Sequence, residues 1–219
     1  MQKKPEIAVV IPFFNEKHTI SEIINKSLQF SDIVIAVDDG STDNSAQQIK
    51  PDEKVILLTN TVNKGKGYSL SRGMLKSIEL NSDITITIDA DLQHPPGYIP
   101  SLIKNLDKFD LVIGNRMTNL QGMPLHRILS NKLTSLILSV KLKQSVSDSQ
   151  CGFRAYKTKI LPGILPSSDG FEAETEILIN AAKKNHKIGF TEIPTIYGSE
   201  KSKMKSFETI RGFLKLMFS

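Results

Sequence analysis

The sequence contains an early apolar run, Ile7-Ala8-Val9-Val10-Ile11-Pro12, which gives way to the polar residues Asn15 and Glu16. A continuous run that is rich in β-branched residues is typical of a strand buried on both faces of a parallel sheet. We therefore expect residues 7–12 to form a buried strand of such a sheet.

The same pattern repeats along the first half of the chain, where apolar runs alternate with segments of helical spacing. Further strands are predicted at residues 33–37, 55–58, 84–88 and 111–113, and helices at residues 19–28 and 66–80. Strands that alternate with helices indicate a mainly parallel sheet with helices on both faces. The expected fold class is α/β.

The second half of the chain is richer in helical segments. The helix predicted at residues 124–142 carries an apolar stripe of Leu125, Leu129, Leu133, Leu136, Ile137 and Val140, with Arg127, Asn131 and Thr134 on the other side. Other elements are expected at residues 152–156 and 187–192 (strands), 173–184 (helix) and 206–218 (helix). We predict a single domain over residues 1–219, with a nucleotide-binding half (1–114), an acceptor half (115–205) and an amphipathic tail (206–219).

Composition and charge exclude some classes of protein. The chain has 219 residues, 39% of them apolar and 23% charged, as in an ordinary globular protein. No apolar run reaches the roughly 18 residues of a transmembrane helix. The net charge of +5 is concentrated in the last third, which suits a phosphorylated substrate, an anionic membrane or simply a solvated surface. Nucleic acid is not an expected partner, because no aromatic residues interleave with the basic ones.

Polar segments follow the first four predicted strands, at residues 12–16, 38–43, 63–67 and 89–96. In an open parallel sheet, ligands bind beyond the carboxyl ends of the strands. The strand pattern alone therefore places all four segments along one edge of the sheet.

Asp89 and Asp91 stand two residues apart after the fourth strand, and Gln93 adds a neutral oxygen. Carboxylates that share a cleft repel each other unless a cation or donor groups compensate for their charge. Mg²⁺ or Mn²⁺, with water and phosphate oxygens completing the shell, is a simple solution. Two aspartates with this spacing, when nothing else accompanies them, more often belong to a solvated turn or a helix cap. The prediction of a metal site therefore depends on the polar residues at the other three strand ends.

The segment Gly65-Lys66-Gly67 precedes a predicted helix. Glycine permits close approach of the backbone, and a helix N-terminus favours anions, so Lys66 is a candidate for binding an anionic group. The alternative is a plain transition from loop to helix, since neither the Walker pattern nor G-x-G-x-x-G is present.

Taken in order, these segments resemble family 2 glycosyltransferases with the GT-A fold. The resemblance is carried by residues 9–16, 37–43, 63–67, 89–95, 114–116, 148–155 and 202–203, nearly the whole chain. Residues 92–95 and the last three segments are similar to the polyprenol-phosphate glycosyltransferases, the branch that includes dolichol-phosphate mannosyltransferases. Phe14 replaces the usual tyrosine, and Thr195 lies near a position that is often arginine in mannosyl enzymes. These departures leave the donor sugar open.

The resemblance implies a role for each matching residue. Contacts with the nucleotide sugar are implied for Pro12, Phe14, Glu16, Val37, Asp39, Asp89, Ala90, Asp91, Arg116 and Lys203, to which Lys66 is added. A lipid phosphate would be bound by Arg116, Arg127, Ser130 and Asn131. The metal, Mg²⁺ or Mn²⁺, would be bound by Asp91 and Gln93, with Asp89 beside them. The implied catalytic group is Asp89, Asp91, Arg116 and Arg127.

The implied reaction moves a sugar, with inversion, from a GDP- or UDP-linked donor to a polyprenyl phosphate. Such an acceptor is already an anion and needs no general base. A glycan hydroxyl is the alternative acceptor, and it would need a base, for which Asp148, Glu172 and Glu174 are candidates. Otherwise the two glutamates are expected to cap or flank the helix at residues 173–184. A nucleotidyltransferase and a non-catalytic nucleotide-sugar-binding protein are further alternatives.

The predicted tail helix carries apolar residues at helical spacing between basic ones. Such a helix can lie in a membrane interface, dock on the core or contact a second copy, and these alternatives stay open. The single cysteine, Cys151, excludes an intrachain disulfide and is compatible with a reducing cytoplasm. We therefore expect a peripheral protein at the cytoplasmic face of a membrane, and the oligomeric state is not predicted.

Overall fold

β1 (Ile7–Phe13) is buried along its whole length in the computed structural model, which describes residues 4–194 and 196. It pairs in parallel with β2 (Ile33–Asp38) on one side and β4 (Ile84–Thr87) on the other. Burial on both faces explains why this segment has no alternation of polar and apolar residues. The predicted buried strand at residues 7–12 is confirmed.

The strands form one seven-stranded sheet in the order β3-β2-β1-β4-β6-β5-β7. The remaining strands are β3 (Val55–Thr59), β5 (Leu111–Asn115), β6 (Arg154–Lys157) and β7 (Ile188–Glu192). β6 runs antiparallel to both of its neighbours, and the other pairs are parallel. The sheet is therefore mainly parallel, as predicted. Because β6 is reversed, the residues that precede it lie at the same edge as the carboxyl ends of β4 and β5.

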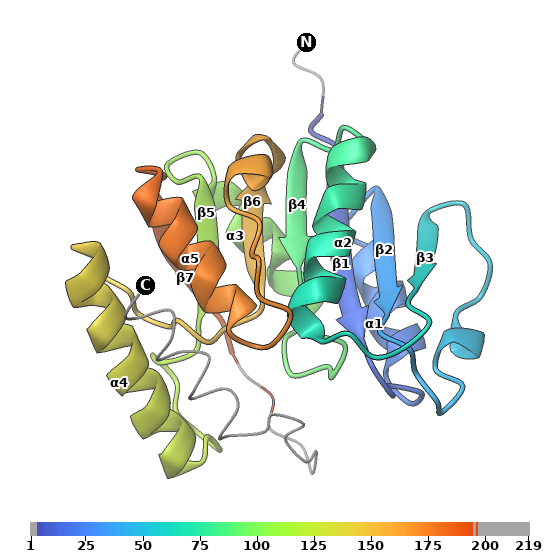
Figure 1. The fold of residues 1–219 in the computed structure, drawn as a ribbon, viewed down its shortest axis with the longest axis horizontal. Coiled ribbons are helices and arrows are strands. Elements are labelled where there is room, and N and C mark those ends of the chain that lie inside the picture. Colours follow the sequence, from blue (N-terminus) through green and yellow to red (C-terminus); the bar gives the residue numbers. More distant parts are fainter. Residues whose placement is uncertain (1–3, 195, 197–219) are drawn as a thin grey trace.

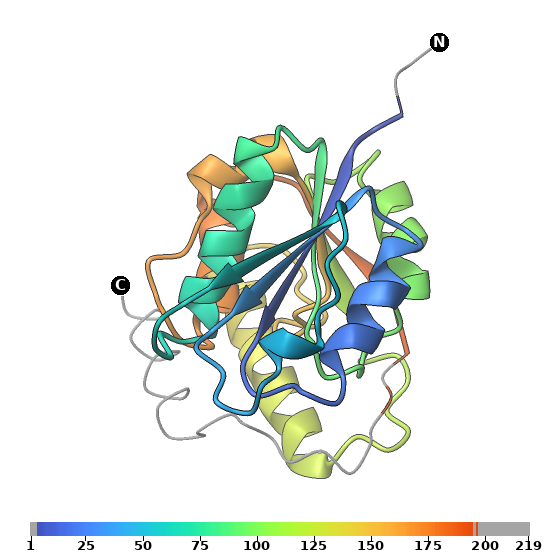
Figure 2. The ribbon, with the colours of Figure 1, turned by 90° about the vertical axis from the view of Figure 1, so that its right-hand side faces the viewer.

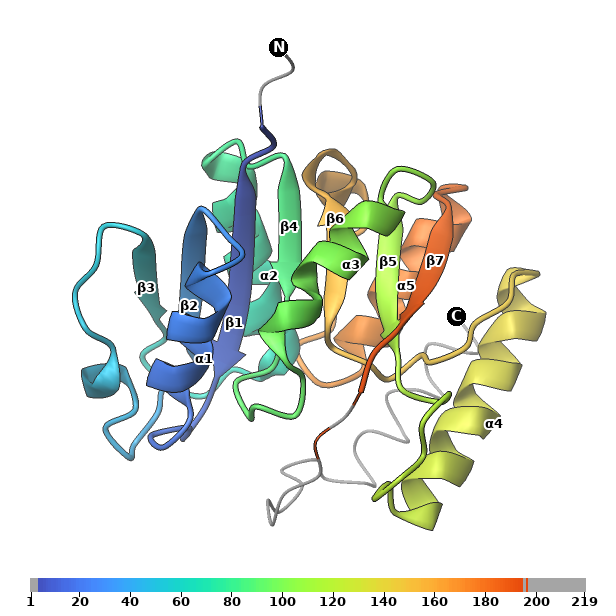
Figure 3. The ribbon, with the colours of Figure 1, turned by 180° about the vertical axis from the view of Figure 1, so that it is seen from behind.

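Helices cover both faces of the sheet, as expected for this fold class. α2 (Lys66–Glu79) and α5 (Ala173–Lys183) lie on one face (Figure 1), and α1 (Ile20–Leu28) and α3 (Ile99–Asn105) lie on the other (Figure 3). Figure 2 shows the twisted sheet between the two layers. Short 3₁₀ turns occupy Ala46–Gln48, Pro96–Tyr98 and Thr158–Gly163. The sequence did not predict α3, a seven-residue helix that buries Ile99 and Leu102.

α4 (Leu125–Leu142) lies beside the sheet and extends past the edge at which the parallel strands end (Figures 1 and 3). An amphipathic helix ordinarily turns its apolar stripe toward the core. Here most of the stripe is exposed, and the buried residues are Asn131, Ser135 and Leu138. The helix is predicted correctly, but its orientation is the reverse of the usual one.

Within the described part of the chain, no helix combines the length and apolar character needed to cross a bilayer. The predicted tail helix and Lys203 lie outside the described residues.

Candidate active site

The four polar segments that follow the first strands meet at one edge of the sheet, as predicted. The backbone N–H of Asn15 donates to Ser41 Oγ over 2.9 Å, joining the ends of β1 and β2. Asp39, after β2, accepts from the backbone N–H groups of Lys64 and Gly65 at 3.0 and 2.9 Å. Lys66 in turn forms an ion pair with Asp89 after β4. These contacts link the strand ends into one continuous site.

Asp39 organises the loop that leads into α2. Besides the two backbone N–H groups, its carboxylate accepts from Asn60 Nδ2 at 2.8 Å and Ser69 Oγ at 2.9 Å. The side chain is buried, and all four donors come from residues 60–69. Gly65 adopts a φ of 103°, which permits the turn into the helix. Asp39 thus fixes the loop that carries Lys66.

Lys66 neutralises two carboxylates at the centre of the site. Its Nζ lies 2.6 Å from Asp89 Oδ1 and 3.0 Å from Glu174 Oε1, and all three side chains are largely buried. Burial by itself would lower the pKa of Lys66, but the charges of Asp89 and Glu174 outweigh burial and raise it. Burial would raise the pKa of Asp89, but Lys66 lowers it overall. Both groups are therefore ionised at neutral pH.

Gly152 closes this cluster from the amino side of β6. A Cβ at this position would lie 2.7 Å from Glu174 Oε1 and 2.8 Å from Asp89 Oδ2. Arg154, which is fully buried, holds the turn by donating to the carbonyl oxygens of Cys151 and Glu174 at 2.7 Å each. The reversed strand therefore packs its backbone against the two carboxylates.

Asp91 and Gln93, the predicted metal ligands, could each offer an oxygen atom to a divalent cation. Both are partly exposed, and between them Leu92 takes a left-handed conformation with a φ of 59°. Asp91 Oδ1 also accepts the backbone N–H of Gln93 at 3.1 Å. Within residues 4–194 and 196, no three His, Cys, Asp or Glu side chains form a metal site by themselves. Two oxygen donors, with phosphate and water supplying the rest, match the way Mg²⁺ binds with nucleotides.

Arg116 is held in one orientation by Asp148. The guanidinium donates from Nε to Asp148 Oδ2 at 2.7 Å and from Nη2 to Oδ1 at 2.9 Å, and the backbone N–H of Arg116 donates to Oδ2 at 3.1 Å. Asn131 Nδ2 adds a bond of 2.6 Å to Oδ1. Asp148 is fully buried, which would raise its pKa, but the bonds and charge of Arg116 lower it. After Lys66, the charge of Arg116 also helps to lower the pKa of Asp89. The Arg116–Asp148 pair is therefore close enough to influence the Lys66–Asp89 pair electrostatically.

α4 carries the residues implied in binding the acceptor phosphate. Asn131 is buried and uses its amide to hold Asp148. Arg127 is partly exposed and stands four residues earlier on the same side of the helix. Ser130 is exposed, and its Oγ accepts from Gln150 Nε2 at 3.3 Å. In this structure Asn131 positions Arg116, while Arg127 and Ser130 remain accessible.

The predicted nucleotide contacts lie in two settings. Pro12 and Val37 are register partners in β1 and β2, and both are buried, as is Ala90. Phe14 and Glu16 are partly exposed in the loop after β1, where Glu16 Oε2 accepts from Thr19 Oγ1 at 3.0 Å. Apart from Ala90, which follows β4, these residues lie at the β1–β2 end of the same edge.

His94 and Cys151 are buried next to the site and do not carry charge there. The His94 ring stacks on Phe153 with centroids 5.9 Å apart, and burial followed by the charge of Arg116 lowers its pKa to about 4. Burial raises the pKa of the Cys151 thiol to about 12. Neither a histidinium nor a thiolate is therefore present at neutral pH.

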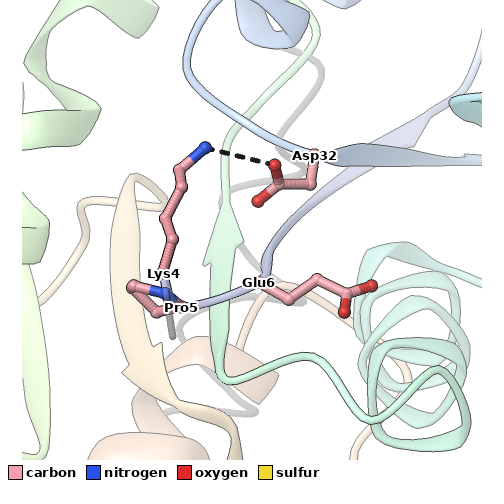
Figure 4. Close-up of a pocket in the computed structure, with 4 residues that line it drawn as sticks. All are labelled: Lys4, Pro5, Glu6 and Asp32. Carbon is pink, nitrogen blue, oxygen red and sulfur yellow. Dashed lines mark hydrogen bonds and ion pairs between the residues drawn. The ribbon is translucent and has the colours of Figure 1, made fainter. Parts of the chain in front are cut away.

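A shallow pocket at the opposite edge is formed by Lys4, Pro5, Glu6 and Asp32, where Lys4 Nζ lies 3.3 Å from Asp32 Oδ1 (Figure 4). It lies at the amino end of β1, far from the polar strand ends. The Lys4 side chain is 78% exposed and that of Asp32 38%, so the ion pair has the character of a surface contact.

Two site residues have roles that the sequence did not indicate. Glu174 was expected to cap α5 or to act as a base, but its side chain pairs with Lys66. Asp148, another candidate base, is the partner of Arg116. The polar run at residues 148–152 marked that segment as unusual, whereas an acidic residue in a first helical turn gave no such signal for Glu174.

Comparison with known proteins gives the relatives of this chain. Residues 8–165 match the family model of glycosyl transferase family 2. The UDP-N-acetylglucosamine–dolichyl-phosphate N-acetylglucosaminyltransferase of Methanococcus voltae is 32% identical, over 94% of this chain and 92% of that protein. The dolichol-phosphate mannosyltransferase of Pyrococcus furiosus is 30% identical, over 97% of this chain and 64% of that protein.

The fold is also similar to solved structures. Glucosyl-3-phosphoglycerate synthase from Mycobacterium tuberculosis, in complex with Mn²⁺, UDP and glucosyl-3-phosphoglycerate, superposes with a TM-score of 0.76. The match covers 96% of this chain and 79% of that one at 20% identity. At this identity the likeness concerns the fold alone, which is GT-A-like.

Proposed function

The chain belongs to glycosyl transferase family 2, and from this premise we propose that it transfers a sugar from a nucleoside diphosphate sugar to a polyprenyl phosphate. The anomeric configuration of the sugar is inverted in a single displacement. The reaction takes place at the cytoplasmic face of a membrane, with the protein bound peripherally.

The environment of Asp148 is the observation that carries this proposal. A hydroxyl acceptor would need a base, but Asp148 is fully buried and both of its oxygens accept from Arg116. Glu174, a second candidate base, is held by Lys66. With two of the three candidate bases engaged, the site suits an acceptor that is already ionised, and a phosphate monoester meets this requirement.

The residues divide the work between donor and acceptor. Asp91 and Gln93 would hold Mg²⁺ or Mn²⁺, and a bound divalent ion neutralises charge that develops on a diphosphate leaving group. Lys66 keeps Asp89 ionised and oriented beside the donor. Arg116 and Arg127 receive the lipid phosphate, whose oxygen attacks the anomeric carbon as the bond to the diphosphate breaks. No proton is transferred, because the nucleophile enters as an anion.

The names of the relatives agree on the kind of acceptor but differ in the sugar that is transferred. The two named above carry dolichyl phosphate or dolichol phosphate in their names, but one is named for N-acetylglucosamine and the other for mannose. We therefore leave the donor as a UDP- or GDP-linked sugar. A thermal-shift panel of both donor classes with Mn²⁺ or Mg²⁺ would identify it, because a ligand that binds only the folded state raises the melting temperature.

Product analysis tests the reaction itself. The enzyme is incubated with the donor and either polyprenyl phosphate or an oligosaccharide, and we expect sugar to appear on the lipid. Transfer to the oligosaccharide alone would overturn the proposal and favour a glycan-extending enzyme. An Asp91→Ala variant should lose on the order of 100-fold in rate, and near-normal turnover would remove Asp91 from the metal site.

A further inference from the structure

The outward face of α4 is an apolar strip on the surface of the protein. Its members are Leu125, Leu129, Leu133, Leu136 and Val140, which are between 59% and 77% exposed. At about 100° per residue, these five positions fall within an arc of about 80°. We call them the leucine face. A continuous exposed strip of this kind on a soluble surface marks an interaction site.

The opposite face of α4 explains why the helix cannot simply turn over. Asn131 donates to Asp148, and Ser135 Oγ donates to Asn131 Oδ1 at 2.9 Å and receives the backbone N–H of Ser149 at 3.0 Å. These bonds fix the polar side of the helix to the segment that holds Arg116. The leucine face is therefore held outward by the geometry of the site.

Charge identifies the partner that fits this face. Residues 112–147 contain no aspartate or glutamate, while Arg127, Lys132, Lys141 and Lys143 lie on α4 or next to its end. A second copy packed by two-fold symmetry would bring these same basic residues together. Residues 201–215 of the chain itself also have an excess of lysine and arginine. The surface of an anionic bilayer offers both apolar chains and complementary charge.

We propose that α4 docks on an anionic phospholipid bilayer with its leucine face in the membrane interface. The polar side of the same helix holds the Asp148–Arg116 pair, so docking places the reaction centre one helix width from the lipid surface. This inference deepens the proposed function, on which it rests for the lipid nature of the acceptor. A polyprenyl phosphate could then enter the site from the bilayer while its chain stays in the membrane.

Vesicle flotation of the full chain tests the proposal. Wild-type protein is mixed with vesicles of phosphatidylcholine and phosphatidylglycerol, and compared with a Leu129→Gln/Leu133→Gln variant. We expect a loss of about tenfold in partitioning for each leucine, on the order of 100-fold for the pair. A Leu57→Gln/Leu75→Gln variant, which alters two exposed leucines away from α4, should float like wild type. A Lys132→Gln/Lys143→Gln variant should lose binding to anionic vesicles but not to neutral ones.

Activity on two acceptors separates this proposal from the function on which it rests. The Leu129→Gln/Leu133→Gln variant should use a short, water-soluble polyprenyl phosphate within about twofold of wild type, but lose transfer to a long-chain acceptor in vesicles. If wild type transfers sugar to neither acceptor and still floats, the proposed function fails and the docking surface stands. If the variant floats like wild type, the docking surface is overturned regardless of activity.

Two further outcomes would also overturn the docking surface. A dimer that sedimentation equilibrium detects in wild type and not in the leucine variant would assign the face to a second copy. A loss of melting temperature without vesicles that is much larger than in the Leu57→Gln/Leu75→Gln control would show that the chain itself covers the face. Equal melting temperatures in the two variants are the expected result.

Discussion

Replacing Asp148 by asparagine should damage both stability and activity, because Asp148 is the buried counterion of Arg116. Its Oδ2 accepts two N–H groups of Arg116, and its Oδ1 accepts from Arg116, Asn131 and the backbone of Gln150. An asparagine keeps the shape but turns an NH₂ group toward at least two donors, whichever oxygen it replaces. The guanidinium, whose side chain is 12% exposed, loses its compensating charge.

The expected size follows from the burial of the pair. Removing one partner of a buried ion pair costs about 3–5 kcal/mol, and we expect the lower end because Arg116 retains some access to water. For a chain of this length, about 3 kcal/mol corresponds to a fall of roughly 6–12 °C in melting temperature. Loss of an oriented positive charge at the reaction centre should also reduce turnover by about 10²–10³-fold.

The pH dependence supplies an independent check. The pKa of Asp148 is lowered in the folded state relative to about 3.9 in the unfolded chain, so its contribution to stability is complete above about pH 5. That contribution is lost as the pH falls through the folded-state pKa. The difference in unfolding free energy between wild type and Asp148→Asn should therefore be constant near neutral pH and shrink below about pH 4.

A matched control is Asp110→Asn, which removes a partly exposed carboxylate that pairs with Lys157 at 2.9 Å on the other side of the molecule. It should cost about 1 kcal/mol or less and leave turnover unchanged. Circular-dichroism melts and a transfer assay measure both variants. An Asp148→Asn protein with wild-type turnover and melting temperature would refute the reasoning. Lost turnover at an unchanged melting temperature would instead point to Asp148 as a general base.

Three further changes probe the rest of the site. Gly152→Ala should lower turnover at least tenfold and the free energy of unfolding by about 1–3 kcal/mol, because the new Cβ would lie 2.7 Å from Glu174 Oε1. The control Gly97→Ala should change neither quantity, because the atom nearest to its new Cβ is 4.0 Å away. Lys66→Gln should lower the free energy of unfolding by about 3 kcal/mol, and adding Glu174→Gln should recover part of this loss. Urea unfolding of all members of this double-mutant cycle measures the effect, and additive losses would contradict the ion pair. The Cys151 thiol should resist iodoacetamide at about pH 8 in the native protein and react in urea, since burial raises its pKa to about 12, and rapid native labelling would show that it is accessible.

The sheet and the polar edge could be predicted because both depend on local pattern. The continuous apolar composition of residues 7–12 predicts a strand buried on both faces, and parallel strands place their carboxyl ends at one edge of the sheet. From these two facts alone, Asp39, Lys66 and Asp89 were expected to lie together, and the structure links them through the loop at residues 60–67.

The direction of β6 and the orientation of α4 could not be predicted in the same way. A four-residue strand has the same pattern in either direction, and only its pairing with β4 and β5 decides between them. The periodicity of α4 defines two faces but not which one is buried. Asn131 is buried because it hydrogen-bonds to Asp148, and Ser135 because it hydrogen-bonds to Ser149. These partners lie outside the helix, and the periodicity of the helix does not reveal them.

Which buried charges pair with each other could not be predicted from the sequence either. Asp148 and Glu174 were both recognised as acidic residues near the site, and a catalytic base was a reasonable hypothesis for each. Their assignment as counterions of Arg116 and Lys66 depends on distances of 2.7 and 3.0 Å between residues that are 32 and 108 positions apart. Composition and spacing contain no information about such pairs.

The place of β6 between β4 and β5 governs how the protein can fold while it is being synthesised. β1 to β4 can pair as soon as residue 87 has left the ribosome, because each of these strands has a partner within that segment. The outer edge of β4 then stays open until residues 154–157 arrive, about 70 residues later, which takes several seconds at roughly 5–20 residues per second. An open edge strand is a template for wrong pairing, so a pause in this interval exposes the nascent chain to aggregation. An unfinished chain that already contains Lys66 and Asp89 therefore lacks the complete charge cluster, since Gly152 and Glu174 join it only after β6 has been made.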